Sequence, residues 1–220
     1  MEGSVYIMDK IYNIFKNRKP GIIGNFKKAS VMLLLTGKQN NPNIVFEVRS
    51  FKLSHQPGDI CLPGGKIEKD EIPRQTAIRE TMEELTLNRE DIYFIGDMDY
   101  VVTPFNFIMF PFVSKLDENA KIVPSQAEVD HIFKVPLNFF MSTEPEMHEL
   151  PIIQKSDKNF PYHLINGGKN YKFREGKVQD YFYKYKDYVI WGFTALVVKR
   201  FVDIIKDNRI GVPDGNYYSS

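Results

Sequence analysis

The amino-acid sequence predicts a mixed α/β fold. Two stretches with the apolar character of buried strands, at residues 29–37 and 43–50, are followed by the most helix-like segment of the chain, at residues 73–85. Further strand-like stretches come next, and a second amphipathic helix is predicted at residues 194–208. This order of strands, helix, strands and helix favours a mixed sheet over a doubly wound parallel one.

The first part of the chain is predicted to contain a helix and a hairpin. Apolar residues at helical spacing indicate an amphipathic helix over residues 5–17, and Pro20 and Gly21 end it. The turn sequence KQNNPN then connects the strands at residues 29–37 and 43–50. These two strands are therefore expected to pair as a hairpin.

The middle of the chain is predicted to contain the central helix and further strands. Pro73 suits the first turn of the helix at residues 73–85, because its missing amide proton costs nothing there. Strand-like stretches follow at residues 91–103 and 107–116. Residues 125–140 indicate a loop and a strand that runs into a short helix.

The last part of the chain begins with a long polar stretch, residues 142–175, which is predicted to be irregular. Strong alternation over residues 171–195 predicts a hairpin with Glu175 and Gly176 near its turn. A stripe of apolar residues then predicts the terminal helix. No repeat, low-complexity linker or sharp change of composition divides the chain, so we expect one main domain with an N-terminal helical extension.

The composition indicates a folded protein with balanced charge. The 29 basic and 28 acidic residues leave a net charge of +1. Nucleic acids and membrane surfaces are therefore not expected partners, because they usually need a basic excess. Cys61 is the single cysteine and cannot form an internal disulfide, so a reducing compartment is the default. Apolar runs fall short of the ~20 residues that cross a bilayer. With no signal peptide expected, we predict a soluble cytoplasmic protein.

Three glutamates of the predicted central helix are neighbours in space. Glu83 and Glu84 lie three and four residues after Glu80, so they share its face of the helix. Like charges at this spacing destabilise a helix by a few tenths of a kcal/mol per pair. The arrangement makes sense if a hard divalent cation lies between them, and oxygen ligands of this kind select Mg²⁺ or Mn²⁺. Glutamate pairs are common on exposed helices. The prediction of a metal site therefore depends on their combination with a Gly-Gly turn and Glu71.

The spacing of these residues resembles the signature of the Nudix hydrolases. That signature runs G, five residues, E, seven residues, then R-E-U-x-E-E-x-G-U, where U is a bulky aliphatic residue. Seven of its nine specified positions match, namely Gly65, Glu71, Arg79, Glu80, Glu83, Glu84 and Leu87. Thr81 stands where an aliphatic residue is expected, and Thr86 where the signature has glycine. Neither position contacts metal in the family, and a glycine at the second one serves a left-handed helix cap.

A second resemblance concerns the residues just before the signature. VRSFKLSHQPGDICLPGG is similar to the pattern of the coenzyme A diphosphatase branch, in which an R-S pair, a spaced leucine and histidine, and a glycine lead into F-P-G-G. The matching positions are Arg49, Ser50, Leu53, His55 and Gly58, and Leu62 replaces the usual phenylalanine. AEVDHIFKVPL and VIWGFTALVV also resemble that branch. We therefore expect a Nudix domain at residues 28–206, a helical extension at 1–27 and a tail at 207–220.

The resemblance implies a fold and a metal centre. The family fold is an α/β/α sandwich with a mixed β-sheet, and the implied cofactor is Mg²⁺ or Mn²⁺. Glu80 and Glu84 are the firmest implied metal ligands, and Glu83 supports a further ion. The backbone carbonyl of Gly64 is another candidate ligand, because a Gly-Gly turn brings bare backbone close to the ions. The implied catalytic residues are Glu71, Arg79, Glu80, Glu83 and Glu128.

Two roles in this set differ from metal binding. Arg79 and Glu71 are expected to form a charge-assisted pair that fixes the helix against its loop. The general base is open between two residues, because members of the superfamily use either a glutamate of the signature or one on a later loop. Glu80 and Glu128 are the two candidates.

The implied reaction is hydrolysis of a nucleoside diphosphate linked to another moiety. For coenzyme A the products would be adenosine 3′,5′-bisphosphate and 4′-phosphopantetheine, or its acylated form. The implied substrate-binding residues are Arg49, Ser50, Lys52 and His55, with Lys66 as a further candidate for the 3′-phosphate. One alternative is a Nudix hydrolase for another substrate such as NADH or ADP-ribose. Another is a Nudix-like binding module without turnover, against which the intact glutamates argue. Because the family contains dimers, a homodimer is a further expectation.

Overall fold

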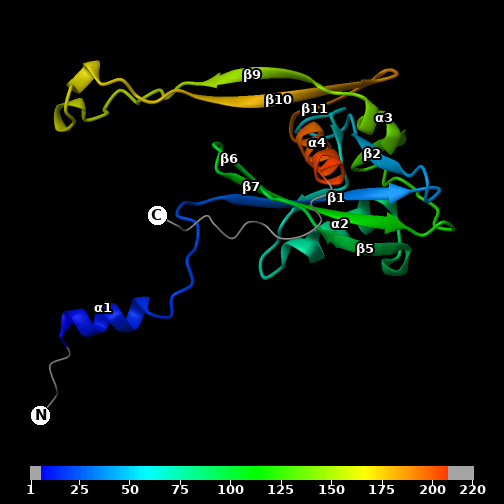
Figure 1. The fold of residues 1–220 in the computed structure, drawn as a ribbon, viewed down its shortest axis with the longest axis horizontal. Coiled ribbons are helices and arrows are strands. Elements are labelled where there is room, and N and C mark those ends of the chain that lie inside the picture. The colour runs from blue at the N-terminus through cyan, green and yellow to red at the C-terminus, as the bar shows by residue number, and fades with distance from the viewer. Residues whose placement is uncertain (1–5, 208–220) are drawn as a thin grey trace, which may run out of the picture.

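The computed structural model describes residues 6–207 of the chain, and these form an α/β/α sandwich with a second, smaller sheet beside it (Figure 1). The helices are α1 (Ile7–Phe15), α2 (Pro73–Leu85), α3 (Leu137–Ser142) and α4 (Gly192–Lys206). The strands of the main sheet are β1 (Lys27–Thr36), β2 (Asn43–Arg49), β3 (Ile60–Cys61), β4 (Gly64–Lys66), β5 (Ile92–Asp97), β6 (Val101–Thr103), β7 (Phe107–Leu116) and β8 (Val129–Pro136). The second sheet consists of β9 (Glu146–Ile152), β10 (Gly176–Tyr185) and β11 (Tyr188–Trp191).

The main sheet is mixed, as the sequence predicts. Its central order is β3-β2-β1-β7-β5, while β4 pairs with β1, β6 with β7 and β8 with β2. Strands β1 and β7 run parallel, and the other pairs in this sheet are antiparallel. The parallel pair needs a long crossover connection, and that connection carries α2. The sheet topology thereby places the central helix against the strands that precede it.

Two hydrophobic cores lie on opposite faces of the main sheet. Alternate residues of β1 enter different cores, because successive strand side chains point to opposite faces. Met32 and Leu34 pack with residues of α2, such as Ala77 and Leu85. Leu33 packs in the other core, which also takes its residues from α4 and the second sheet. Buried apolar surface therefore joins the second sheet to the main one through α4.

Several predicted elements are confirmed by the structure. Strands β1 and β2 form the expected antiparallel hairpin, with Leu35 opposite Ile44. Helix α2 has the predicted bounds, and α4 lies within two residues of its predicted ends. The predicted strand at residues 91–103 is divided into β5 and β6, which both pair with β7.

The hairpin predicted over residues 171–195 is present as β10 and β11, but the prediction that its turn lies near Glu175 and Gly176 is wrong. Gly176 begins β10, and the tight turn lies ten residues later, where Tyr185 pairs with Tyr188 across Lys186 and Asp187. Lys186 takes a positive φ of 54°, which this short turn requires. Alternation identified the strands, but it does not mark which end of a strand carries the turn.

The stretch at residues 142–175 contains a strand that the sequence did not reveal. Strand β9 pairs along its length with β10, from Glu146 opposite Phe182 to Ile152 opposite Gly176. Its side chains are almost all exposed, so no apolar alternation marks it. Together β9 and β10 project as a long ribbon, with residues 153–175 at its tip (Figure 1).

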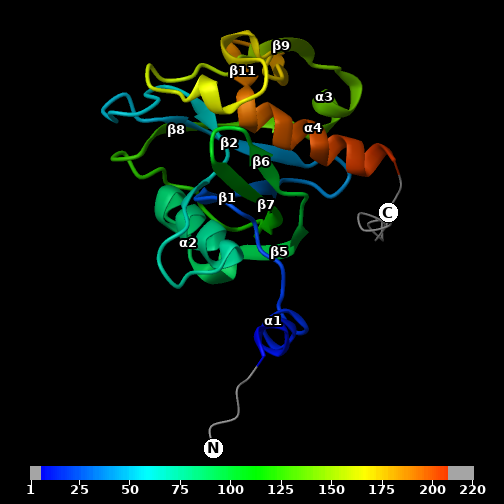
Figure 2. The ribbon, with the colours of Figure 1, turned by 90° about the vertical axis from the view of Figure 1, so that its left-hand side faces the viewer.

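Helix α1 lies apart from the sandwich in both views (Figures 1 and 2). It is confirmed as a helix within the predicted range, and none of its residues is buried. Between residues 6 and 207, no helix combines the length and the apolar character needed to cross a membrane.

Candidate active site

Three glutamates from two parts of the chain gather at one end of α2. Glu80, Glu84 and Glu128 each offer a carboxylate oxygen, and these oxygens all lie within 4.8 Å of one another. We call these three residues the carboxylate cluster. The two helix residues are four apart and therefore share a face. The donor set suits a hard divalent cation, because Mg²⁺ and Mn²⁺ prefer carboxylate oxygens.

Glu128 reaches the cluster because its loop is tied to the end of α2. The amide of Ser125 donates a hydrogen bond to the Glu84 carbonyl at 2.8 Å, and the amide of Val123 donates to the Leu85 carbonyl at 3.0 Å. On its other side, the amide of Ser50 donates to the Glu128 carbonyl at 2.8 Å. The general-base candidate on the later loop is thus held beside the helix glutamates.

The Gly-Gly turn fits closely against the same glutamates. The amide of Gly64 donates a hydrogen bond to Glu84 Oε2 at 2.8 Å. Gly64 takes a φ of +149°, and a Cβ there would collide with the backbone carbonyl of Ser30. A Cβ on Gly65 would instead collide with the carboxylate of Glu80. The two glycines are therefore required for different reasons. Gly64 leaves room for the backbone of β1, and Gly65 leaves room for a carboxylate of the cluster.

Arg79 organises the rim of the site. Its guanidinium lies 2.9 Å from Glu71 Oε1, 2.9 Å from Glu80 Oε1 and 3.0 Å from Glu83 Oε2. The predicted pair between Arg79 and Glu71 is present in the structure. Glu83 is 58% exposed at its side chain and points to Arg79, so the structure does not bring it into the carboxylate cluster. Its role with a further ion stays a prediction.

Two carboxyl groups of the site, those of Glu84 and Glu80, have raised pKa values. Burial, together with the charges of Glu80 and Glu128, raises the pKa of Glu84 to about 8, although its hydrogen bond from Gly64 acts in the opposite direction. Burial also raises the pKa of Glu80, against the lowering effect of Arg79. The raised pKa values of Glu80 and Glu84 indicate too little positive charge around these two carboxylates, and a bound cation would supply it.

Glu47 is a site residue that the sequence analysis missed. It lies on β2, its side chain is fully buried, and its pKa is raised well above the ordinary value by burial and by Glu84. Cys61 Sγ lies 3.8 Å from Glu47 Oε2. A signal was present in the sequence, because Glu47 is the one acid in the otherwise buried strand sequence NIVFEVR. A charged residue at such a position is rarely there for packing.

The predicted substrate-binding residues before the Gly-Gly turn do not all lie at one place. Arg49 lines a cavity beside the Gly-Gly turn, and its charge acts on both Glu47 and Glu84. Ser50 is buried, and its hydroxyl donates to the Gln126 carbonyl at 3.5 Å. Ser50 therefore fastens the loop of Glu128 and does not face the cavity. Three basic side chains at exposed positions, Lys52, His55 and Lys66, do not line the cavity either.

A cavity of about 690 Å³ opens next to the carboxylate cluster, and we call it the main cavity. Gly64, Gly65 and Arg49 form its end near the cluster. Apolar side chains of both sheets form most of its walls, among them Val31, Leu62, Met109, Ile152, Ile153, Val178, Trp191 and Phe193. Its size is within the range of small-molecule sites, which are about 300–1,000 Å³. The β9–β10 ribbon thus provides one wall of a pocket that adjoins the acidic site.

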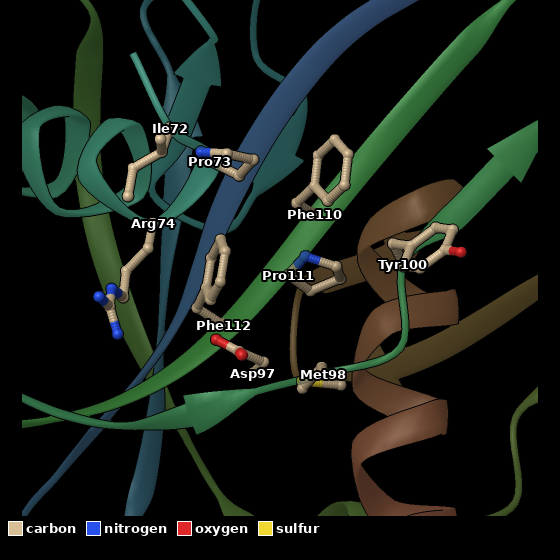
Figure 3. A pocket seen from close by; sticks show the side chains of 9 residues that line it. All are labelled: Ile72, Pro73, Arg74, Asp97, Met98, Tyr100, Phe110, Pro111 and Phe112. Atoms are coloured by element: carbon tan, nitrogen blue, oxygen red, sulfur yellow. The ribbon is translucent and has the colours of Figure 1, made fainter. Parts of the chain in front are cut away.

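A second cavity of about 410 Å³ lies at the other end of α2 (Figure 3). Figure 3 shows aromatic and proline side chains of β7 at its centre, with Arg74 of α2 and Tyr100 on opposite sides. None of the predicted site residues lines it. The main cavity is therefore the candidate substrate site.

The two departures from the Nudix signature are accommodated locally. Thr81 is fully buried, and its hydroxyl donates to the Ala77 carbonyl at 2.6 Å, so a polar group is satisfied where an aliphatic one is usual. Thr86 caps α2 with φ 51° and ψ 53°, the left-handed conformation that glycine would adopt there. The helix therefore ends as the signature requires, at some conformational cost.

Replacing Glu71 with glutamine is expected to destabilise the fold in a pH-dependent way. Hydrogen bonds from Arg79 lower the pKa of Glu71 to about 2, so its ionised form stabilises the fold above the ordinary pKa of 4.5. That contribution is lost as the pH falls through about 2. At pH 7 we expect a loss of about 1–2 kcal/mol, since solvent screens this rim position.

Urea unfolding of Glu71→Gln and the unchanged protein between pH 3 and 7 measures this effect. The difference between them should shrink as the pH falls below 4.5. Glu68→Gln removes the same charge from the same loop and serves as the control. A difference that is constant across this range would contradict the ion-pair explanation.

Comparison with known proteins identifies the family. A model described as NUDIX domain matches residues 26–151. The chain is 32% identical over 139 residues to "Peroxisomal coenzyme A diphosphatase NUDT7" of Mus musculus, covering 63% of this chain and 58% of that protein. It is 33% identical over 117 residues to "Peroxisomal coenzyme A diphosphatase ndx-8" of Caenorhabditis elegans, covering 51% and 50%. It is 28% identical over 178 residues to "Nudix hydrolase 15, mitochondrial" of Arabidopsis thaliana, covering 79% and 57%. The chain thus spans less than three fifths of the length of these relatives.

A solved structure supports the fold independently. A MutT/nudix family protein from Enterococcus faecalis superposes with a TM-score of 0.50 at 12% sequence identity, covering 90% of this chain and 69% of that one. At this identity the similarity concerns the fold alone. The family model covers more than half of the chain and includes the carboxylate cluster, the Gly-Gly turn and α2. The protein is therefore a member of the Nudix hydrolase superfamily.

Proposed function

We propose that the protein is a metal-dependent hydrolase that cleaves the diphosphate of coenzyme A or its acyl derivatives. The products would be adenosine 3′,5′-bisphosphate and 4′-phosphopantetheine, or its acylated form. The observation that carries the proposal is the position of the carboxylate cluster at one end of a largely apolar cavity of about 690 Å³. A substrate with a diphosphate joined to a long, weakly polar arm matches both parts of this site.

Mg²⁺ or Mn²⁺ would be held by Glu80 and Glu84, with Glu128 facing the same position. A bound cation neutralises phosphate oxygens and lowers the pKa of the attacking water. The chain's own residues position this chemistry, because the Gly64 amide orients Glu84 and Arg79 orients Glu80. The carbonyl of Gly64 stays a predicted further ligand.

Glu128 is the better candidate for the general base. Its side chain is exposed on a loop, whereas Glu80 already shares its charge with Arg79 at 2.9 Å. The guanidinium of Arg79 occupies an oxygen of Glu80, which leaves that carboxylate less free to take a proton from a water molecule. In this proposal Glu128 accepts the proton of the attacking water.

The walls of the main cavity support a pantetheine or acyl arm as the occupant. Ile152 and Val178 come from the β9–β10 ribbon, while Val31 and Met109 come from the main sheet. At the cluster end, Arg49 brings a positive charge to the position of the diphosphate. Lys52 and His55 lie outside this cavity, and their contact with the 3′-phosphate stays a prediction.

The names of the mouse and nematode relatives support the same substrate class. We further propose that the hydrolase domain extends from residue 28 to 206, because α4 and the second sheet share a core with the main sheet. The extension at residues 1–27 and the tail at 207–220 then flank it, although residues 1–5 and 208–220 lie outside the described part. The homodimer and the cytoplasmic location stay predictions.

A substrate screen tests the proposal. Coenzyme A, NADH, ADP-ribose and diadenosine polyphosphates are incubated with the full chain and Mg²⁺ or Mn²⁺, and the products are separated and identified by mass. We expect adenosine 3′,5′-bisphosphate from coenzyme A. Cleavage of NADH alone would contradict the assignment to coenzyme A. No hydrolysis of any compound would favour a binding module without turnover.

Filling the main cavity should weaken turnover of coenzyme A. Val178→Trp adds a large side chain to the cavity wall formed by β10, and we expect kcat/KM for coenzyme A to fall about tenfold or more. The matched control is Val189→Trp, because Val189 lies in the same sheet, is 44% exposed and does not line the cavity. Equal kcat/KM values for the two variants would contradict the use of this cavity by the substrate.

A further inference from the structure

Helix α1 has an apolar face that nothing in the described part of the chain covers. With 3.6 residues per turn, its apolar residues fall on one side of the helix, and Asp9, Lys10 and Asn13 fall on the other. Each of the apolar residues is between 43% and 70% exposed, and these are Ile7, Met8, Ile11, Tyr12, Ile14 and Phe15. A continuous exposed apolar face usually marks a binding surface, so α1 calls for an apolar partner.

The ribbon tip, residues 153–175, is an ordered structure at the end of β9 and β10. The ring centroid of Phe160 lies 4.9 Å from that of Tyr162 and 5.8 Å from that of Phe173. Two short 3₁₀ helices, Tyr162–Leu164 and Gly168–Asn170, belong to the same tip. Three of its apolar residues nevertheless stay exposed, namely Ile153, Leu164 and Tyr171. The tip therefore combines a packed interior with apolar side chains at its surface.

Both segments are basic. The ribbon tip has two acidic residues and five exposed basic ones, namely Lys155, Lys158, Lys169, Lys172 and Arg174. No ion pair within residues 6–207 involves any of these five side chains. Residues 6–26, which contain α1, have four basic residues and one acidic one. Each segment thus carries a net charge of +3, whereas the rest of the chain carries −5.

The two segments extend from the same side of the sandwich. Both lie to the left of it in Figure 1, and Figure 2 views the molecule from that side, with the ribbon tip at the top and α1 at the bottom. One flat surface in front of this side can contact both segments. The arrangement therefore favours a broad partner over a small ligand.

We propose that α1 and the ribbon tip bind the protein to the surface of a membrane that contains anionic phospholipids. The apolar face of α1 enters the boundary between head groups and acyl chains, and the basic side chains of both segments contact lipid phosphates. A nucleic acid matches the charge but offers no apolar layer for α1. The balanced charge of the whole chain, which argues against a membrane partner in the sequence, averages these two basic segments with the acidic remainder.

Flotation with lipid vesicles tests the proposal. The full chain is mixed with phosphatidylcholine vesicles that contain about one third phosphatidylglycerol, or with vesicles of phosphatidylcholine alone, and is centrifuged in a density gradient. We expect flotation with the anionic vesicles and little with the neutral ones. Raising the salt from about 0.1 M to about 1 M shortens the screening length from about 10 Å to about 3 Å and should weaken binding at least tenfold.

Ile11→Glu tests the contribution of α1. It places a charge in the middle of the apolar face, and we expect binding to anionic vesicles to weaken at least tenfold. The matched control is Asn13→Glu, which adds the same charge to the same helix on its polar side and should bind much more tightly than Ile11→Glu. Both positions are exposed, so neither change disturbs the core of the sandwich.

The double substitution Lys169→Glu and Lys172→Glu tests the ribbon tip. It reverses two exposed charges and should also weaken binding at least tenfold. The matched control is Lys38→Glu with Lys121→Glu. These two exposed lysines follow β1 and β7, which run parallel, so they lie at the opposite ends of these strands from α1. This control should float almost like the unchanged protein.

Three results would overturn the proposal. One is the absence of flotation with anionic vesicles at low salt, and another is equal flotation of the test variants and their controls. The third is binding of a single-stranded RNA oligonucleotide that the change at Lys169 and Lys172 abolishes, without any binding to vesicles, because it would assign the tip to nucleic acid. The assay contains no nucleotide substrate and no divalent cation, so its result is independent of the proposed hydrolysis.

Discussion

Glu84→Gln is expected to lower turnover by at least about a hundredfold while the fold stays intact, the scale of losing one preorganised electrostatic contact. Glu84 is the member of the carboxylate cluster that touches most of the site, because it accepts from the Gly64 amide and faces both Glu80 and Glu128. Glutamine keeps the shape and can still accept that hydrogen bond. It removes the negative charge that a cation needs, so the loss should appear in both kcat and metal affinity.

Steady-state kinetics with coenzyme A at several Mn²⁺ concentrations measures this prediction. The matched control is Glu90→Gln, which makes the same change at an exposed position just beyond α2. We expect near-normal rates for the control. Turnover of Glu84→Gln at the level of the unchanged protein would sink the assignment of Glu84 to the metal centre.

The same substitution should stabilise the protein in the absence of metal. The folded-state pKa of Glu84 is raised to about 8 from 4.5, so the folded state binds more protons than the unfolded state between these values. Stability of the metal-free protein should therefore fall as the pH rises from 4.5 to 8. Glu84→Gln removes this titration and should be more stable at pH 8, by on the order of 1–3 kcal/mol. The gain at pH 8, absent at pH 4.5, is visible in urea unfolding.

Glu84→Gln is thus expected to lower turnover and to raise the stability of the metal-free protein. Unpaired carboxylates destabilise the metal-free fold, yet they are the groups that bind a cation. Arg79 limits the cost at the rim, where Glu71 and Glu83 share its guanidinium. No equivalent partner protects the buried pair of Glu47 and Glu84 except Arg49, within the part of the chain that the structure describes.

Local patterns in the sequence predicted the centre of the site well. The bounds of α2 follow from its apolar spacing and Pro73, and helical spacing alone puts Glu80 beside Glu84. Glu128 required the resemblance to a known family, because 44 residues separate it from Glu84 and only tertiary hydrogen bonds bring its loop to the helix. The structure brings carboxylate oxygens of these three residues within 4.8 Å of one another.

Contacts between distant segments could not be predicted in the same way. Strand β9 has exposed side chains, so neither its existence nor its place beside the main cavity follows from periodicity. Ser50 matched the family pattern, but the pattern does not say that its hydroxyl is used on the loop of Glu128. The sequence shows Glu47 as an acid within a buried strand. It does not show that Glu47 lies beside Glu84, because 37 residues separate the two.

Gly65→Ala is expected to weaken cation binding at least tenfold and to lower kcat by about ten- to a hundredfold, with little loss of stability. The added Cβ would collide with the carboxylate of Glu80, and Arg79 already holds that carboxylate on its other side. Glu80 must therefore leave its place in the cluster. The backbone of Gly65 does not have a positive φ, so alanine itself is tolerated there.

The neighbouring glycine shows why this test is specific. A Cβ on Gly64 would collide with the backbone of Ser30 and Val31, at a φ that alanine rarely adopts, so that variant would damage the fold itself. At Gly65 the obstacle is a single functional side chain. The matched control is Gly96→Ala, since Gly96 has open space around its Cβ position. Mn²⁺ affinity, kcat and the urea midpoint are measured for both variants. If Gly65→Ala keeps normal Mn²⁺ affinity and kcat, Glu80 does not need its observed position, and the carboxylate cluster would lose its role as the metal centre.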